Sequence, residues 1–351
     1  MTTEIETPAV LIDLDIAEAN IAAAQRQFDA MGVQFRPHIK THKIPRLARL
    51  QLREGAHGIA VQKLSEAEVF VAEGFDDILL CFNLLSPAKI ERLVVLSTQC
   101  HLTVVADNLE TVQALSTGFA GSDQPLAVLV ECDTGMGRCG VQTPQDAADL
   151  AHAIDQAPGL RFQGLLTYPA VQGEAAVQAF MSAAKALCIV AVGHCKTISS
   201  GGTPTMTDAV LAPVVTEYRA GTYIYNDRSL MARGACTLAD CALTVLATVV
   251  SRPSPTRVIL DAGSKSLTSD LLGLQGYGYV VEFPEARITA LSEEHAILTL
   301  PPGQPGPAIG QKLHIIPNHA CPVSNLVDQV FFHRSGTLIG AQDVNARGCV
   351  T

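Results

Sequence analysis

The stretch Val33-Gln34-Phe35-Arg36-Pro37-His38-Ile39-Lys40-Thr41-His42-Lys43 begins as a β-strand and ends in a basic, imidazole-rich turn. Alternation along a strand from Phe35 to Lys40 would place His38 and Lys40 on one face. A lysine at the carboxyl end of a barrel strand lies where α/β barrels carry their chemistry. Partial desolvation and nearby cations make such an amine lose its proton more easily, and it can then form a Schiff base. A solvated basic loop before a helix is the alternative that this stretch alone leaves open.

Short apolar, β-branched runs alternate with amphipathic helical stretches through the first two-thirds of the chain. The expected strands are Phe35–Lys40, Gly58–Val61, Asp77–Cys81, Leu102–Ala106, Leu126–Glu131, Phe162–Thr167, Thr197–Ser200 and Glu217–Gly221. The expected helices include Ser65–Glu73, Pro87–Leu96, Gln145–Gln156 and Gly173–Val192. This alternation indicates a parallel sheet, and eight repeats in about 200 residues predict a closed (β/α)8 barrel. A doubly wound open sheet is the alternative, but no Gly-rich dinucleotide fingerprint follows any strand.

The pattern changes near residue 233, where strand-like runs alternate with connections that contain Pro and Gly. These runs are Leu243–Val250, Arg257–Asp261, Tyr277–Val281, Ala296–Leu300, Lys312–Ile316 and Val330–His333. They indicate a mainly β domain. We therefore expect a barrel over residues 9–232 and a mainly β domain over residues 233–351. A further strand within residues 1–14 is a candidate to join the second domain.

The composition describes a globular protein with a substantial core. The 351 residues are 48% hydrophobic and 17% charged, and the formal net charge of -10 argues against a nucleic-acid partner. Apolar runs such as Cys241–Val250 are too short to span a bilayer, and the first residues lack the pattern of a signal peptide. Ten cysteines without a paired C-x-x-C framework suit a reducing compartment. We therefore expect a cytoplasmic protein with a small-molecule substrate.

Two further motifs carry chemistry. His319 and Cys321 form an H-x-C pair, which on a strand would point both side chains to one face. Imidazole and thiolate together favour Zn²⁺ or a similar divalent metal. The turn Ser200-Gly201-Gly202-Thr203 and the pair Gly221-Thr222 follow the seventh and eighth expected strands, where barrels often bind phosphate. Alone, each of these motifs is also compatible with an ordinary turn.

Together these motifs resemble a known family. The ordered set is the lysine after the first strand, Val130-Glu131-Cys132-Asp133-Thr134-Gly135-Met136-Gly137-Arg138-Cys139-Gly140-Val141, Ser199-Ser200-Gly201-Gly202-Thr203-Pro204-Thr205, Glu217-Tyr218-Arg219-Ala220-Gly221-Thr222-Tyr223 and Pro317-Asn318-His319-Ala320-Cys321-Pro322. It is similar to the metal-activated pyridoxal-phosphate enzymes that include D-threonine aldolase and eukaryotic-type D-serine dehydratase. The resemblance covers nearly the whole chain. It implies an alanine-racemase-like barrel followed by a β domain, and a homodimer.

The resemblance also implies roles for particular residues. Lys40 would carry pyridoxal phosphate as a Schiff base. Lys43 is the internal competitor and ranks lower, because the family lysine ends the strand whereas Lys43 is expected to start the following helix. Arg138 and Tyr168 would lie near the cofactor ring, and His38 is a candidate to enter the same pocket. The two phosphate motifs would hold the phosphate, and Arg219 would meet the pyridine nitrogen. His319 and Cys321 would bind a divalent metal, Zn²⁺ or Mn²⁺.

The resemblance implies a lyase acting on D-3-hydroxy amino acids. We expect cleavage like that of D-threonine aldolase, giving glycine and an aldehyde. The alternative is elimination by a D-serine or D-threo-3-hydroxyaspartate dehydratase, because dehydratases of the family pair His with Cys whereas some aldolases use His with Asp. A non-catalytic pyridoxal-phosphate carrier and a racemase are further alternatives. One departure is Ala170-Val171, where family members often have Gly-His after the tyrosine.

Overall fold

The computed structural model describes residues 5–351, and the chain separates by its internal contacts into two units. The barrel unit comprises Ala24–Lys40, Pro45–Gly221 and Cys349–Thr351. The β unit comprises the chain up to Ala23 together with Thr41–Ile44 and Thr222–Gly348. Residues 9–23, 41–44 and 222–232, which were expected in the barrel, therefore group with the β unit, and Cys349–Thr351, expected in the mainly β domain, group with the barrel unit. Residues 1–4 of the expected N-terminal segment lie outside the described residues.

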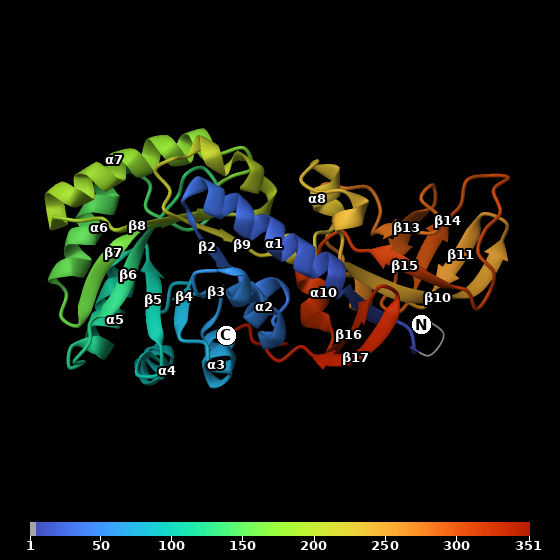
Figure 1. The fold of residues 1–351 in the computed structure, drawn as a ribbon, viewed down its shortest axis with the longest axis horizontal. Coiled ribbons are helices and arrows are strands. Elements are labelled where there is room, and N and C mark those ends of the chain that lie inside the picture. The colour runs from blue at the N-terminus through green and yellow to red at the C-terminus, as the bar shows by residue number, and fades with distance from the viewer. Residues whose placement is uncertain (1–4) are drawn as a thin grey trace. The chain divides into compact units, whose positions relative to one another are not determined.

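The barrel unit contains an eight-stranded sheet in the order β2-β9-β8-β7-β6-β5-β4-β3, and every pairing in it is parallel (Figure 1). The strands are β2 (Gln34–Pro37), β3 (Ile59–Val61), β4 (Asp77–Leu80), β5 (His101–Ala106), β6 (Leu126–Cys132), β7 (Leu160–Thr167), β8 (Thr197–Gly201) and β9 (Glu217–Ala220). An isolated bridge between His38 and Ala60 links the two end strands, so the barrel is nearly closed. The predicted (β/α)8 barrel is confirmed.

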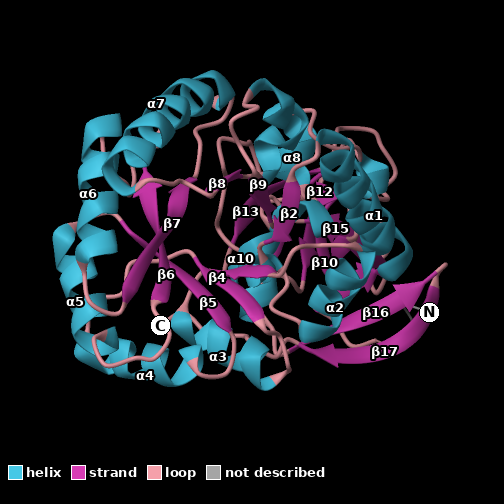
Figure 2. Ribbon diagram, turned by 60° about the vertical axis from the view of Figure 1, so that its left-hand side comes forward, coloured by secondary structure: helices cyan, strands magenta, loops and turns pink. Residues whose placement is uncertain are grey.

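Helices connect the strands and lie outside them, as Figure 2 shows for α4 to α7. The bounds are α1 (Leu14–Met31), α2 (Pro45–Glu54), α3 (Leu64–Ala72), α4 (Pro87–Ser97), α5 (Leu109–Phe119), α6 (Pro144–Gln156) and α7 (Glu174–Val192). Local sequence explains where helices begin: Thr143 and Asp146 form a reciprocal capping box at the start of α6. All four named helices are confirmed, and α5 is an additional one.

Small and medium apolar side chains fill the inside of the barrel. One buried cluster takes one residue from each of β3 to β7, namely Ala60, Leu79, Val105, Leu129 and Leu166. Alternation along the strands supplies these residues, because every second side chain points inward. Each large apolar side chain buried in this way stabilises the fold by about 1.5–3 kcal/mol. These apolar side chains therefore pack the inside of the barrel along β3 to β7.

Helix α7 is more apolar than the runs considered in the sequence. By length and composition alone, Glu174–Val192 could cross a membrane. Its inner face is nevertheless buried in the protein through Val177, Met181, Ala184 and Cys188. The backbone N–H of Val214 also donates a 2.9 Å hydrogen bond to the Gln178 side chain. These are the contacts of a barrel helix.

The β unit is built on a nine-stranded sheet with the main order β13-β14-β11-β10-β1-β16-β17. Its strands are β1 (Ala9–Asp13), β10 (Leu243–Ser254), β11 (Arg257–Leu260), β12 (Tyr279–Val280), β13 (Arg287–Leu291), β14 (Ala296–Thr299), β15 (Lys312–Ile316), β16 (Gln329–Arg334) and β17 (Thr337–Asp343). Short helices are α8 (Arg228–Ala232), α9 (Ser264–Leu267) and α10 (Ala320–Leu326). Strand β1 lies between β10, which is antiparallel to it, and β16, which is parallel. The mainly β character is confirmed, and β13 and β17 are strands that the sequence analysis did not name.

Candidate functional site

Lys40 lies just after the first barrel strand, but not on it. Strand β2 ends at Pro37, and Ile39–Thr41 form a 3-10 turn, so the predicted strand through Lys40 was wrong. A proline has no N–H to continue the hydrogen-bonded ladder, which favours a strand end there. His38 and Lys40 still converge, because both contact Gln62: His38 Nε2 lies 3.2 Å and Lys40 Nζ 3.3 Å from Gln62 Oε1. Gln62 directly follows β3, a position from which it could have been predicted.

The competing lysine, Lys43, has a different environment. It is buried in a left-handed backbone conformation with φ of 57°, and its ammonium donates to the carbonyl of Ala346 at 3.3 Å. Helix α2 begins at Pro45, so Lys43 precedes the helix instead of starting it. Because Lys43 binds a backbone carbonyl of the β unit, these contacts favour Lys40 as the cofactor anchor.

Arg138 lies on a tightly held loop after β6. Its guanidinium carbon is 4.9 Å from the centre of the Tyr168 ring, a cation–π contact. The carboxylate of Asp133 accepts hydrogen bonds from the N–H groups of Gly135, at 2.9 Å, and Gly137, at 3.1 Å. The loop then returns to β6, where Val141 N–H donates to the Glu131 carbonyl. Arg138 is thus positioned by the loop and by the tyrosine that follows β7.

We expect Asp133→Ala to loosen this loop. Partial burial disfavours the ionised carboxylate, but hydrogen bonds from Gly135 and Gly137 outweigh it and lower the pKa of Asp133 below 3.8. The carboxylate therefore stabilises the loop fully above pH 4 and loses that effect as pH falls through its folded pKa. Its removal should lower the free energy of unfolding by about 1 kcal/mol at pH 7 and by less in acid. Hydrogen exchange of residues 133–140 measures the change, and an equal rate in wild-type and Asp133→Ala protein would contradict it.

The expected phosphate turn lies beside Tyr168. Strand β8 ends at Gly201, and a nine-residue 3-10 helix begins at Thr203. A Cβ atom on Gly201 would lie 1.9 Å from the Arg219 carbonyl oxygen, so only glycine fits there. A Cβ on Gly202 would lie 3.6 Å from the Tyr168 ring. Together with the buried Ser200, the turn places backbone and small side chains next to this tyrosine, as a phosphate site requires.

Arg219 is buried on β9 and makes two short hydrogen bonds. Its guanidinium donates to Ser199 Oγ at 2.6 Å and to the Thr167 carbonyl at 2.8 Å. The pKa of Cys81, the residue after β4, depends on the charges near its thiol. Burial raises the pKa of the Cys81 thiol, while the charges of Arg219 and Lys40 act to lower it. The charges of Lys40 and Arg219 therefore both act on the thiol that follows β4, at the carboxyl end of the barrel strands.

Glu131, the penultimate residue of β6, is a titratable group that the sequence analysis did not single out as a site residue. Burial raises the pKa of its carboxyl group, and the charges of Arg138 and Arg219 oppose that rise. The residue is only 7% exposed. It therefore adds a carboxyl group to the arginine-rich end of the barrel. Its position at a strand end could have identified it.

His319 and Cys321 lie at the start of helix α10, so the predicted strand for this pair was wrong. His319 precedes the helix in an extended conformation and Cys321 is its second residue, which still lets the two side chains interact. Burial disfavours a charged His319, but its hydrogen bonds with Cys321 and Asp270 raise its pKa to about 9. Burial opposes ionisation of Cys321 as well, and the contact with His319 nevertheless lowers the pKa of the thiol. The pair therefore favours imidazolium and thiolate.

Polar side chains surround this pair within the β unit. Cys321 Sγ lies 3.1 Å from Thr41 Oγ1 and 3.3 Å from Thr222 Oγ1, while Asp270 Oδ2 lies 2.7 Å from His319 Nδ1. The Thr222 side chain, expected near phosphate, thus contacts the thiol, and Gly221 follows β9. The chain from Ile5 onward contains no cluster of three or more His, Cys, Asp and Glu side chains that could hold a metal.

Two observations test whether implied groups fit these residues. Tyr225 is fully buried, its hydroxyl has no hydrogen-bond partner among the described residues, and the charge of Cys321 acts on it. An orphaned hydroxyl near an imidazole–thiolate pair fits a site that takes a further polar group. In the barrel unit, the Gly201-Gly202 turn and the stacked Arg138–Tyr168 pair form a cradle of the kind that a phosphorylated aromatic cofactor needs. Both implied groups therefore fit.

The barrel with a lysine after its first strand, joined to a mainly β unit, defines an alanine-racemase-like protein. Residues 12–229 match the family model described as alanine racemase, N-terminal domain, and residues 242–333 match a serine dehydratase domain. D-threonine aldolase from Arthrobacter sp is 36% identical over 358 residues, covering 98% of this chain and 93% of the relative. D-threo-3-hydroxyaspartate dehydratase from Delftia sp. (strain HT23) is 34% identical over 349 residues, covering 90% and 91%.

A solved structure agrees. The crystal structure of D-threonine aldolase from Filomicrobium marinum matches with a TM-score of 0.90 and 31% identity, covering 99% of this chain and 97% of that one. The chain therefore belongs to the family of D-threonine aldolases and D-serine dehydratase-like proteins, as the motifs indicated. This family and the alanine-racemase-like fold are pyridoxal-phosphate-dependent.

Proposed function

We propose that this protein is a pyridoxal-phosphate- and divalent-metal-dependent lyase that cleaves D-3-hydroxy amino acids, as D-threonine aldolase does, to glycine and an aldehyde. The position of Lys40 just after the first barrel strand, where its Nζ lies 3.3 Å from Gln62 Oε1, carries the proposal. Sequence identity to the Arthrobacter D-threonine aldolase supports the reaction.

Residues of the barrel unit would hold pyridoxal phosphate. Lys40 would bind it covalently, Arg138 and Tyr168 would flank the ring, and the turn from Ser200 to Thr203 would receive the phosphate. Pyridoxal phosphate, when bound, supplies an electron sink for cleavage of a bond to the substrate's Cα. The Arg219 guanidinium, fixed by Ser199 and Thr167, would present positive charge to the ring. Lys40 would also carry a proton to or from the substrate, and the Gln62 amide oxygen, which contacts both Lys40 and His38, would orient the two side chains.

Residues of the β unit would hold the metal. Asp270 binds Nδ1 of His319, which leaves Nε2 as the ligating nitrogen beside the Cys321 sulfur. This is the arrangement in which a carboxylate fixes the tautomer of a metal-binding histidine. A divalent metal, when bound, supplies a Lewis acid for the substrate's 3-hydroxyl. Imidazole with thiolate favours Zn²⁺, and Mn²⁺ is the second candidate.

Elimination to a 2-oxo acid and ammonia is the second candidate function. The dehydratase from Delftia matches at 34% identity, close to the aldolase from Arthrobacter at 36%. The His319–Cys321 pair also favours elimination, because the resemblance implies that dehydratases of the family pair His with Cys. A non-catalytic carrier is disfavoured, because the chain includes a segment matching the serine dehydratase domain.

A product assay decides between these functions. Purified protein with pyridoxal phosphate and either Mn²⁺ or Zn²⁺ is given D-threonine, D-serine or D-threo-3-hydroxyaspartate. Glycine and acetaldehyde from D-threonine are the expected products. Pyruvate from D-serine, or a 2-oxo acid from the other substrates, would establish the dehydratase instead. No product from any substrate, with cofactor bound, would overturn the lyase proposal.

A further inference from the structure

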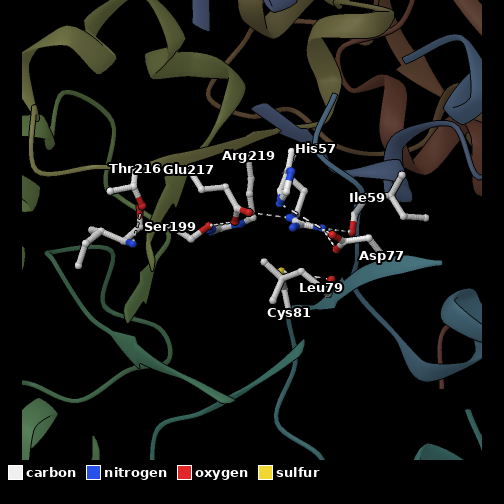
Figure 3. Close-up of polar contacts among 11 residues, drawn as sticks. His57, Ile59, Asp77, Leu79, Cys81, Ser199, Thr216, Glu217 and Arg219 are labelled. Atoms are coloured by element: carbon white, nitrogen blue, oxygen red, sulfur yellow. Dashed lines mark hydrogen bonds and ion pairs between the residues drawn. The ribbon is translucent and has the colours of Figure 1, made fainter. Parts of the chain in front are cut away.

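A series of polar contacts runs across the barrel from the partly exposed Asp77 to Arg219, and its other members are buried. Figure 3 labels four of its members, Asp77, Glu217, Ser199 and Arg219. Arg36 on β2 donates from Nε to Glu217 Oε2 at 2.7 Å and from Nη1 to Asp77 Oδ1 at 2.6 Å. Ser199 Oγ donates to Glu217 Oε1 at 2.6 Å and accepts from Arg219 at 2.6 Å. The order is therefore Asp77, Arg36, Glu217, Ser199 and Arg219.

The first part of this series of contacts, from Asp77 to Glu217, links strands of the barrel to one another. Strands β2 and β3 share only an isolated bridge, and Arg36 reaches past it to the Ile59 carbonyl on β3, at 3.4 Å, and to Asp77 on β4. Arg36 and Glu217 are 6% and 3% exposed. The ion pair between them is thus fixed in place by the barrel wall. The Glu217 carboxylate is therefore held in place, and its other oxygen, Oε1, is a fixed hydrogen-bond acceptor.

The second half transmits that rigidity to Arg219. Ser199 is fully buried and has one hydroxyl proton, which it gives to Glu217. Its lone pair must then face Arg219, so the direction of the hydrogen bond is fixed. Alternation on β9 places Glu217 and Arg219 on the same face, with Arg219 one step of two residues nearer the carboxyl end. Arg219 makes no ion pair with a carboxylate among the residues from Ile5 to Thr351 that the structure describes.

Burying the three charges of Arg36, Glu217 and Arg219 is costly, and apolar side chains of the same size would often stabilise a core as well. The series of contacts is therefore better explained by the orientation that it gives the Arg219 guanidinium than by a gain in stability. We propose that Ser199 and Glu217 are positioning residues that hold the Arg219 guanidinium at the pyridine ring of the cofactor. Glu217 supplies the counter-charge through Ser199, without binding Arg219 directly. This inference rests on the proposed function, because it concerns the cofactor that Lys40 would bind.

Four variants test the inference. Ser199→Ala removes the acceptor of Arg219, Ser199→Thr retains a hydroxyl, and Glu217→Gln retains the shape without the charge. Thr216→Val is the matched control, because its hydroxyl bonds the neighbouring backbone of Ile198 and does not touch Arg219. Each protein is freed of cofactor. The dissociation constant of pyridoxal phosphate is measured by equilibrium dialysis, and the pH midpoint of the bound cofactor's absorbance is measured by titration.

Ser199→Ala is expected to weaken cofactor binding about tenfold and to shift the absorbance midpoint. Glu217→Gln should shift the midpoint as well, while Ser199→Thr and Thr216→Val should keep wild-type values. Equal values for Ser199→Ala and Thr216→Val would overturn the inference. Should Ser199→Ala fail to fold, an unchanged midpoint in Glu217→Gln overturns it. Wild-type protein that binds no pyridoxal phosphate would overturn the proposed function, whereas wild-type binding with unchanged variants would overturn this inference alone.

Discussion

Lys40→Ala protein should contain no covalently bound pyridoxal phosphate and should have lost lyase turnover. The amine is the expected anchor of the cofactor and a candidate proton carrier. Loss of a positioned proton carrier alone costs about 10²–10⁴-fold in rate. Borohydride reduction of wild-type protein followed by peptide mapping should label the peptide that contains Lys40. The measurements are the visible absorbance of the bound cofactor and the rate of glycine formation from D-threonine.

Lys43→Ala is the matched control for this prediction. It removes a neighbouring lysine that donates to the Ala346 carbonyl, so a loss of stability without loss of cofactor labelling is expected. Retained absorbance in Lys40→Ala protein, together with its loss in Lys43→Ala, would move the anchor to Lys43. That result would contradict the assignment of Lys40 made from its position after β2.

Cys321→Ala protein should bind pyridoxal phosphate normally but lose its metal and most of its turnover. Even an outer partner of a metal ligand commonly contributes 10–100-fold to metal affinity, so loss of a direct ligand should cost at least about 100-fold. Elemental analysis after dialysis measures the bound Zn²⁺ or Mn²⁺, and the product assay measures turnover. Cys321→Asp should restore part of both, because carboxylate is also a ligand for these metals.

Cys100→Ala is the control for the thiol. Burial raises the pKa of Cys100 to about 11, which makes it a poor metal ligand at neutral pH. Its removal should leave the metal content unchanged. Wild-type metal content and turnover in Cys321→Ala protein would exclude the metal role of this pair and would leave Lys40 and its neighbours as the only part of the proposal still standing.

The barrel could be predicted from sequence because strands and helices repeat their apolar residues at different spacings along the chain. Short apolar strand patterns therefore alternate visibly with helical patterns. Local breaks in that regularity were harder to predict. The strand that leads to Lys40 ends at Pro37, and a 3-10 turn takes its place. His319 and Cys321 were expected on a strand, but a short helix begins between them. In both places the two side chains of the pair still come together, although the alternation of side chains along a strand is not the reason.

Partners from distant parts of the chain could not be predicted. Asp270 binds His319 across 49 positions, and Glu217 binds Arg36 across 181. Nothing in the local pattern around either carboxylate indicates which cation it will find, because that depends on how the strands are ordered in the sheet. Gln62 is different, since its place directly after β3 marks the end of the barrel where polar side chains gather. The rule that strand ends carry chemistry could have identified it.

Strand β1 has a consequence for how the polypeptide is made. Its residues, Ala9–Asp13, are synthesised more than 200 residues before their partners on β10 and β16. During that interval an apolar strand with two open edges has no native neighbour in its sheet, which is a condition that promotes aggregation. Slow translation or a chaperone bound to β1 should therefore affect the yield of this protein more than that of a barrel whose first strand pairs with its second.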